Sequence, residues 1–325
     1  MRLLKLIPDD TNIDFVRLRG WAFGLTAFLT VLAVAAVFAR GLNLGVDFVG
    51  GLMIEAKFDQ PPALNKLRST IDRLEVGDVQ LGQFGDKKIV SIRLPVPKGA
   101  DEGATNAEVK RVQTAVKAGF PDAVFTRTDT VSGKVSGELI WRGSLAVLIA
   151  VFAIALWGWF RFEWQFGFST FVAIAHDVLM TLGFFAVTRL EFDLTIVAAV
   201  LTIVGYSIND KIVIDDRIRE NMRKYRQMDM RGLVNLSVNE TLPRTVMTSL
   251  TILLALASLA IFGGHVLRGL TFAMILGVVV GTYSSIYVSS SLLITLGLQP
   301  QPFAAPKVKG APSNAEYIPT QKERR

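Results

Sequence analysis

The sequence predicts an α-helical polytopic membrane protein with six transmembrane helices and a small α+β domain of the ferredoxin-like kind outside the membrane. Two observations lead to this prediction. First, 51% of the 325 residues are hydrophobic, and they gather in long blocks, whereas a soluble domain usually contains fewer and disperses them. Second, residues 40–138 contain no such block and show strand and helix periodicities instead.

Six apolar blocks are each long enough to cross roughly 30 Å of hydrocarbon, which takes about 20 residues of helix. They run Trp21–Ala39, Leu139–Trp159, Phe166–Val187, Leu194–Ile214, Val246–Phe262 and Leu270–Leu298. The first has no small-residue cleavage site after it, so we expect it to remain as a membrane anchor. Residues 1–20 then form a charged lead, and we expect 299–325, rich in Pro, Lys and Gln, to be a disordered tail.

The basic residues are distributed unevenly among the connections between the blocks. Seven Lys and Arg lie from Arg217 to Arg244, whereas the connections at 188–193 and 263–269 contain one each. Because cytoplasmic loops are enriched in Lys and Arg, the basic connection, the N-terminus and the tail are predicted to lie in the cytoplasm. The net charge of +7 therefore indicates membrane topology, and we expect no nucleic-acid partner.

Residues 40–138 are predicted to form one compact domain on the outer, periplasmic side. Leu52–Phe58 alternates between apolar and polar residues like a half-buried strand. The predicted elements are a strand, a helix, a two-stranded hairpin turning at Gly85–Asp86, a helix and a strand, over 52–58, 61–75, 79–84, 88–94, 105–118 and 123–128. This order is that of a ferredoxin-like fold.

The connection 215–243 is charged and amphipathic, with Ile218, Met222 and Tyr225 on one helical face. A helix with this pattern can lie in the plane of the membrane with its apolar face in the lipid. We therefore expect this segment to lie along the cytoplasmic membrane surface.

Ionisable side chains inside the spans are the candidates for function, because each costs roughly 2.5–3.5 kcal/mol at mid-bilayer. The third block contains His176 and Asp177, and the fourth contains Asp210 and Lys211. Asp177 is expected near mid-membrane, and Asp210 about one helical turn from the cytoplasmic end of its block. Adjacent helical residues point about 100° apart, so we do not expect His176 and Asp177 to act as a pair.

Two interpretations of Asp210 are open. Near the membrane interface, a carboxylate can extend to water or pair with Lys211 without any functional role. Alternatively, Asp210 belongs to a polar face with Tyr206 and Ser207, which requires a polar bundle interior or a path for water. In that case Arg244, at the start of the fifth block, is the natural counter-ion.

The sixth block contains a face of small residues. Gly277 and Gly281 are four positions apart, and Ser284 and Ser285 follow. Such a face favours close packing between transmembrane helices and occurs in many spans. It predicts a helix bundle and indicates no particular function.

Several kinds of chemistry are excluded by what the chain lacks. It contains no Cys, which rules out disulfides, iron–sulfur clusters and thiol catalysis. It contains no GxxxxGK[ST] loop for nucleotide hydrolysis, and its two histidines, His176 and His265, are too few for a multi-histidine metal site. Gly205-Tyr206-Ser207 only loosely matches a serine nucleophile motif. We expect no cofactor, no metal and no enzymatic activity.

Several stretches of the chain resemble motifs of one family. They are GVDFVGG over Gly45–Gly51, AHDVLMT over Ala175–Thr181, VGYSINDKIVIDDRIREN over Val204–Asn221, ETLPRTVMTSLT over Glu240–Thr251, and the segments FGG, LRGLTFAM and GTYSSIYVSSS within Phe262–Ser291. On these residues the chain resembles the smaller subunit of SecDF, a bacterial protein-export complex in the resistance-nodulation-division transporter superfamily. The similarity covers nearly the whole chain.

The resemblance implies roles for particular residues. Those implied in proton coupling are Asp210, Arg244 and Asp177. Those of the motif that leads into the external domain are Gly45, Asp47, Gly50 and Gly51. The expected supporting polar face consists of Tyr206, Ser207, Asn209, Lys211, Thr248 and His176.

Lys211 departs from the family pattern, in which Ser or Thr follows the aspartate. An ammonium beside Asp210 would favour the charged carboxylate and weaken it as a reversible proton carrier. Lys211 could instead point to the membrane interface or pair with Asp215 at i+4. The departure bears on the strength of proton coupling and leaves the family resemblance intact.

The resemblance implies a non-enzymatic subunit that uses the proton-motive force to assist export through the Sec translocon at the periplasmic side of the bacterial inner membrane. The implied partners are a SecD-type subunit, the translocon SecYEG, a YajC-type accessory protein, the unfolded exported polypeptide and protons. Two alternatives are a proton-coupled exporter of lipids or small molecules of the same superfamily, and a purely structural assembly factor. The last predicts that Asp210→Asn leaves function intact.

Overall fold

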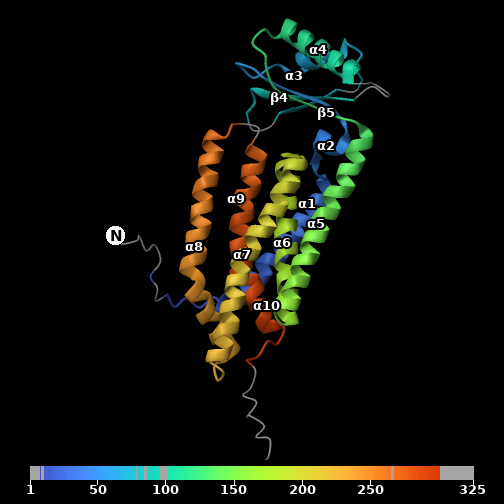
Figure 1. The fold of residues 1–325 in the computed structure, drawn as a ribbon. Helices are drawn as coiled ribbons and strands as arrows, with labels where there is room; N and C mark the ends of the chain where they lie inside the picture. The colour runs from blue at the N-terminus through green and yellow to red at the C-terminus, as the bar shows by residue number, and fades with distance from the viewer. Residues whose placement is uncertain are drawn as a thin grey trace, which may run out of the picture.

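The computed structural model describes residues 8, 11–77, 79–83, 86–95, 102–264 and 267–300. It is an elongated bundle of helices with a small domain of strands and helices at one end (Figure 1). Six helices are long and apolar enough to cross a membrane: Val16–Arg40, Val135–Arg161, Trp164–Thr188, Leu194–Lys224, Met230–Phe262 and Arg268–Thr295. The predicted class of polytopic helical membrane protein is confirmed.

The helical elements of the bundle differ in how deeply they are buried. They are η1 (Val16–Leu18), α1 (Arg19–Arg40), α5 (Gly133–Arg161), α6 (Trp164–Thr188), α7 (Leu194–Lys224), α8 (Met230–Phe262), α9 (Arg268–Tyr283), the π-helical turn η2 (Ser284–Ser289) and α10 (Ser290–Thr295). The last three together form the sixth span. It is strongly buried, as are α6 and α7, whereas the most apolar stretches of α5 and α8 contain few buried residues.

The domain at the end of the bundle is a four-stranded antiparallel sheet with two helices on the face away from the bundle (Figure 1). Its elements are β2 (Gly51–Lys57), α3 (Leu64–Asp72), β3 (Gln80–Gln83), β4 (Ile89–Leu94), α4 (Glu102–Gly119) and β5 (Val124–Val131). The strand order β3-β4-β2-β5 with this chain order is the predicted ferredoxin-like arrangement. Part of the predicted turn at Gly85–Asp86 lies outside the described residues.

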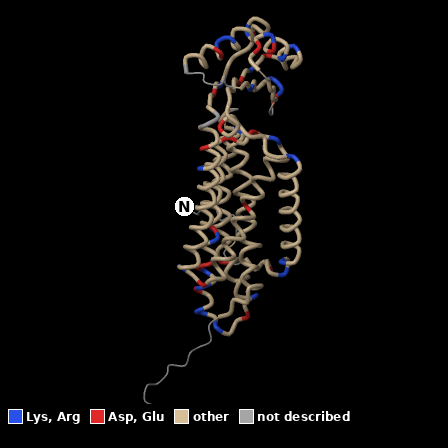
Figure 2. Tube along the Cα trace, turned by 90° about the vertical axis from the view of Figure 1, so that its right-hand side faces the viewer, with Lys and Arg blue, Asp and Glu red and all other residues tan. Residues whose placement is uncertain are grey.

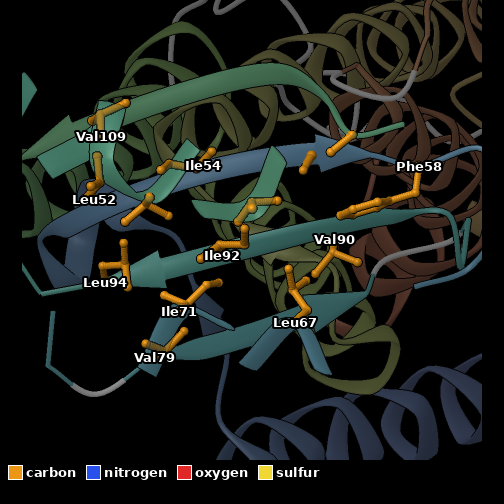
Figure 3. Packing of buried hydrophobic residues seen from close by; sticks show 14 residues of the cluster. Leu52, Ile54, Phe58, Leu67, Ile71, Val79, Val90, Ile92, Leu94 and Val109 are labelled. Carbon is orange, nitrogen blue, oxygen red and sulfur yellow. The ribbon is translucent and has the colours of Figure 1, made fainter. Parts of the chain in front are cut away.

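The core of this domain lies between the sheet and its two helices. Leu52, Ile54 and Ile92 point from the central strands into a cluster that Leu67 and Ile71 of α3 complete (Figure 3). The prediction that the first strand is half-buried is wrong, because Met53 and Glu55 on its opposite face are also buried. That face is directed toward the end of the bundle, where Glu55 lines a pocket with residues of the connection between α6 and α7.

The segment 215–243 does not form a separate surface helix, which corrects the prediction. Its residues continue α7 to Lys224 and begin α8 at Met230, so the two spans extend as one helical hairpin. Ile218, Met222 and Leu233 are buried in a cluster with Phe15 near the start of the first span. The apolar face of the segment therefore packs against protein.

The charged residues divide the molecule into zones (Figure 2). Lys, Arg, Asp and Glu gather in the sheet domain and at the opposite end of the bundle, and few lie between. The predicted disordered tail lies outside the described residues, apart from 299 and 300, and so does most of 1–10.

Candidate functional site

The centre of the bundle contains polar and charged side chains that are almost fully buried. Those that can carry charge are His176, Asp177, Asp210, Lys211 and Asp215, each at most 5% exposed. A buried charge is costly unless the protein supplies a partner. Their partners divide these residues into three groups around α7.

The first group is centred on Asp177 of α6. Its Oδ2 accepts hydrogen bonds from the hydroxyls of Ser207 at 2.6 Å and Ser284 at 3.0 Å, and its Oδ1 lies 3.1 Å from His176 Nδ1. The expectation that His176 and Asp177 do not act as a pair is therefore wrong. Their Cβ atoms diverge around the helix, but rotation about the side-chain bonds brings the two polar ends together.

The Ser284 hydroxyl comes from the π-helical turn of the sixth span. Such turns inside α-helices are frequent at functional sites. Just before it, a Cβ on Gly277 would lie 2.4 Å from Ile203 Cγ1, and one on Gly281 would lie 3.0 Å from Ser207 Cβ. The small-residue face thus lets the sixth span approach α7 closely, and this approach also brings a hydroxyl to the α6 carboxylate.

Asp210 forms the second group and faces α8. It is 2% exposed, and its Oδ2 has no hydrogen-bond partner among the described residues. The groups of α8 that act on it are the Thr248 hydroxyl and the Arg244 charge. Arg244 is itself exposed, and no ion pair of 4.0 Å or less joins it to Asp210 within the described chain. Asp210 is therefore a buried carboxylate with an unsatisfied oxygen, which can take up a proton.

Lys211 and Asp215 form the third group. Lys211 Nζ lies 2.9 Å from Asp215 Oδ2, and both side chains are buried. The ammonium also donates to Ser169 of α6 at 3.0 Å and to Ser289 of the π-helical turn. Of the possibilities open for Lys211, the structure shows the i+4 pair. Asp210 neither extends to water nor pairs with Lys211.

The predicted polar face on α7 is divided among several neighbours, which corrects the prediction of one shared face. Tyr206 Oη donates to Ser249 Oγ of α8 at 2.8 Å, whereas Ser207 bonds to α6. Asn209 is exposed on the outside of the bundle. Because α6, α8 and the sixth span surround α7, consecutive polar residues meet different helices.

The glycine-rich motif before the sheet turns the chain against the connection between α6 and α7. Its first part follows β1 (Asn43–Leu44), which pairs in parallel with β6 (Glu191–Phe192), and the short helix α2 (Val46–Val49) comes next. A Cβ on Gly45 would lie 2.9 Å from a carboxylate oxygen of β6. Gly50 and Gly51 have φ of 74° and 131°, which glycine adopts at little cost.

Two carboxylates at this place cap the start of α7. Asp47 Oδ2 accepts a hydrogen bond from Leu194 N at 2.9 Å, and Asp193 Oδ1 accepts one from Ile196 N at 3.0 Å. The first N–H groups of a helix have no partner within the helix. The motif therefore fastens the external domain to the span that contains Asp210.

Arginines of the sheet hold the same connection. Arg93 of β4 pairs with Glu191 at 3.1 Å and donates to Asn43 Oδ1 at 3.2 Å, and Arg127 of β5 lies 3.8 Å from Asp193. Burial raises the pKa of the Glu191 and Asp193 carboxyls, and the nearby arginines oppose the rise. We call Asn43, Asp47, Arg93, Arg127, Glu191 and Asp193 the outer junction.

Sequence reasoning missed several of these residues. They are Ser169, Ser289, Arg93, Arg127, Glu191 and Asp193. Single serines in apolar helices and charges in an extramembrane domain are common, so none gave a signal alone. One signal was present: the run YSSIYVSSS places five serines within nine residues of an apolar span. Such a density of hydroxyls indicates a polar neighbour.

Together the fold and the buried charges define a class. Six spanning helices with ionisable side chains facing the bundle interior are typical of membrane transport proteins, in which such groups mark ion or proton pathways. Among membrane transport proteins, a small external domain that follows the first span and contacts the start of α7 defines a narrower class.

The chain belongs to the SecD/SecF family of protein export membrane proteins. The family described as "Protein export membrane protein SecD/SecF, C-terminal" matches residues 111–299, a range that contains Asp177, Asp210 and Arg244. The "SecD/SecF GG Motif" matches residues 35–62, which contain Gly50 and Gly51. Family membership predicted from the motifs is thus confirmed.

The relatives are similar over almost their whole length. The chain is 44% identical to the protein translocase subunit SecF of Rhodobacter capsulatus over 306 residues, covering 91% of this chain and 92% of the relative. It is 38% identical to SecF of Rickettsia rickettsii, covering 89% and 94%.

Two solved structures are also similar. SecDF of Thermus thermophilus, described as a translocon-associated membrane protein, matches with a TM-score of 0.80 and 35% identity over 90% of this chain. A SecDF structure in a super-membrane-facing form matches with a TM-score of 0.65 and 36% identity, covering 89% of this chain and 39% of that chain. This chain spans only 40% of the first SecDF chain.

Proposed function

We propose that this chain is the SecF-type subunit of a membrane complex that uses the proton-motive force to assist protein export through the Sec translocon. The observation that carries the proposal is Asp210, a buried carboxylate in α7 with an unsatisfied oxygen. A carboxylate kept in this way inside a bundle is typical of proton pathways. The proposed role of the chain is non-hydrolytic, since gain and loss of a proton suffice to change the charge of Asp210.

The proposed location is the bacterial inner membrane, with both termini in the cytoplasm and the sheet domain in the periplasm. The support is the charge distribution: the ends of α7 and α8 around residues 217–231 are rich in Lys and Arg, at the end of the bundle opposite the sheet domain (Figures 1 and 2). Basic segments stay in the cytoplasm during insertion.

A SecD-type subunit is the proposed partner inside the membrane. Thr202 and Asn209 are exposed on α7, two turns apart on a helix. Lipid offers no hydrogen-bond partner to an amide, so this face calls for a protein neighbour. The matched SecDF chain is more than twice as long as this one, which is consistent with a second set of spans beside α7.

The remaining proposed partners belong to the export pathway. They are the translocon SecYEG, a YajC-type accessory protein and the unfolded polypeptide that emerges into the periplasm. The support is the description of the matched SecDF structure as translocon-associated. The sheet domain, with any larger domain of the SecD-type partner, would hold the emerging chain.

The proposed working step is a change of charge at Asp210. A proton from the periplasmic side binds the carboxylate and neutralises it, which ends its attraction to Arg244. Release of the proton to the cytoplasm restores the charge and the attraction. Arginine remains protonated throughout, so Arg244 is an electrostatic partner and carries no proton itself.

The helix α7 provides the connection from this charge to the sheet domain. It runs unbroken from Leu194 to Lys224, and Asp210 is 16 residues (210 − 194) after its first residue, about 24 Å along the axis. Its start is capped by Asp47 of the external domain's motif. A shift of α7 against α8 therefore moves the sheet domain.

The driving force is sufficient for such a shift. One elementary charge moving through 100 mV provides about 2.3 kcal/mol. Against RT this changes the ratio of two conformations about 50-fold. A single proton is therefore enough to reverse a modest conformational preference.

The test is export by cells that contain Asp210→Asn in place of the native protein. We expect precursor export to lose its stimulation by a proton gradient, while the variant accumulates normally, because Asn keeps the size but has no titratable charge. Asp216→Asn removes an exposed carboxylate from the same helix and serves as the matched control. Gradient stimulation equal to wild type in Asp210→Asn would refute the proposal.

A further inference from the structure

The pair Lys211–Asp215 has no part in the proposed step, yet it is among the most buried ion pairs of the described chain. Both residues are 2% exposed, and Nζ lies 2.9 Å from Oδ2. Its other partners are the hydroxyls of Ser169 on α6 and Ser289 on the sixth span. The ammonium is therefore directed to the side of α7 that packs on α6 and the sixth span.

Asp210 precedes Lys211 in the chain and faces another way. Consecutive helical residues point about 100° apart, and the groups that act on Asp210 come from α8. Lysine has a long flexible stem, so the angle alone does not keep its ammonium from the adjacent carboxylate. Charges in a low-dielectric interior attract strongly, and therefore something must hold the ammonium.

We propose that Asp215 is a positioning residue, which holds the Lys211 ammonium against α6 and the sixth span and so prevents it from neutralising Asp210. The proposal rests on the proposed role of Asp210 as the proton carrier. It explains how a lysine can lie beside that carboxylate, because Asp215 balances the lysine charge one turn further along the helix. Asp210 then responds to Arg244 of α8.

The other neighbours of α7 place few competing charges near Asp210. The His176–Asp177 pair of α6 is bonded within its own group. Residues 269–295 of the sixth span contain no Asp, Glu, Lys, Arg or His. Arg161 of α5 and Glu240 of α8 lie with Arg244 around a pocket between these helices. Among the buried charges of the bundle, the Lys211 ammonium is the one adjacent to Asp210 in the chain.

The test uses the full chain in membranes with its SecD-type partner, and it measures gradient-driven export as a function of pH. In Asp215→Asn, Lys211 keeps two hydroxyls but loses its counter-charge, and a buried unpaired charge seeks another partner. We expect export at pH 7 to fall several-fold and the pH profile to move about one unit toward lower pH, because an ammonium near Asp210 favours its charged form.

The double variant Lys211→Thr with Asp215→Asn removes both charges and leaves Asp210 facing α8. We expect wild-type export and a wild-type pH profile from it, and the same from the control Asp216→Asn. A purely structural pair would lower the amount of protein in the membrane without moving the profile. If Asp215→Asn does not accumulate, Asp215→Ser replaces it, since it also removes the counter-charge and leaves a small polar side chain.

Two outcomes overturn the positioning role. One is an unshifted profile in Asp215→Asn, or in Asp215→Ser where that variant is used. The other is loss of gradient-driven export in the double variant at wild-type abundance, which would show that the pair itself takes part in proton transfer. Asp210→Asn separates this test from the larger proposal: if it is inactive while Asp215→Asn equals wild type, only the positioning role is wrong.

Discussion

The outer junction at the start of α7 and the buried groups in the middle of α7 provide partners for their charged side chains in different ways. At the junction, arginines of the sheet pair with Glu191 and Asp193 across the domain boundary, and these side chains remain 15–27% exposed. In the middle, Lys211 and Asp215 pair within the helix and are nearly inaccessible, while Asp210 keeps an unsatisfied oxygen. The junction is built from many redundant contacts, whereas the middle depends on single charges.

This difference has an energetic consequence. A partly exposed ion pair contributes about 0–1 kcal/mol, and hydrogen bonds of Arg93 to residues 43 and 44 and of Asp193 to the start of α7 accompany the pairs at the junction. Removing one partner from a buried pair costs about 3–5 kcal/mol. Each single replacement at the junction should therefore lower the stability by a small amount. A single replacement among the buried groups should lower it strongly.

The largest effect is expected at Asp177. Replacing Asp177 with Ala removes the acceptor of the Ser207 hydroxyl and the partner of His176, and each buried unsatisfied group costs about 1–3 kcal/mol. Ser284 can still donate to Gly281 O. We expect thermal unfolding of the purified protein in detergent at a markedly lower temperature. Asp177→Asn keeps one acceptor oxygen and should lose less. Equal unfolding temperatures for Asp177→Ala and wild type would show that this group is not a stabilising centre.

At the junction, the largest change is expected from Arg93→Ala. It removes the pair with Glu191 and the hydrogen bond to Asn43, which together contribute about 1–2 kcal/mol. Amide hydrogen exchange in β1 and β6 should become about tenfold faster or more. The control is Arg111→Ala, whose exposed pair with Glu108 lies within one helix. Similar exchange in both variants would contradict a holding role for Arg93.

A smaller effect is expected at the cap of α7. Asp47→Ala removes the acceptor for Leu194 N, and loss of a helix cap costs about 1 kcal/mol. Exchange in the first turn of α7 should accelerate about fivefold, as expected for a loss of about 1 kcal/mol, and gradient-driven export should fall because the sheet domain follows α7 less closely. Asp47→Asn retains an acceptor oxygen and should restore both. Export unaffected by Asp47→Ala would show that this contact transmits no motion.

The smallest effect is a pH dependence of the junction. Burial raises the pKa of Glu191 and Asp193, so the formed junction binds more protons than the open one. Its stability is therefore greatest below the ordinary carboxyl pKa and falls as pH rises through the raised values. Exchange protection of β6, corrected for intrinsic rates, should be higher at pH 5 than at pH 8. Glu191→Gln should show a weaker pH dependence, and an unchanged one would exclude Glu191 as its source.

The sequence was sufficient for the fold because the relevant signals are local. The length of each apolar block predicts a span, and the periodicities of 52–128 predict the elements of the sheet domain. The segment 215–243 was misplaced because an amphipathic pattern shows that a face is apolar without showing what covers it. Here Phe15 and neighbouring helices cover Ile218 and Met222, and lipid does not.

The candidate site was only partly predictable because its contacts join distant parts of the chain. The charges Asp177, Asp210 and Lys211 stand out in apolar spans. Their partners do not, since Ser169 and Ser289 meet Lys211 only after α6 and the sixth span pack on α7. The outer junction joins residues almost 150 positions apart, and no local pattern predicts such a pairing.

The most direct test of the central claim is proton movement through Asp210 itself. The chain and its SecD-type partner are reconstituted in liposomes with an internal pH-sensitive dye, and a proton gradient is imposed during polypeptide translocation. We predict that wild type and Asp216→Asn admit protons at equal rates and that Asp210→Asn reduces entry to the level of empty liposomes. Proton entry through Asp210→Asn at the wild-type rate would contradict the assignment of Asp210 as the proton carrier.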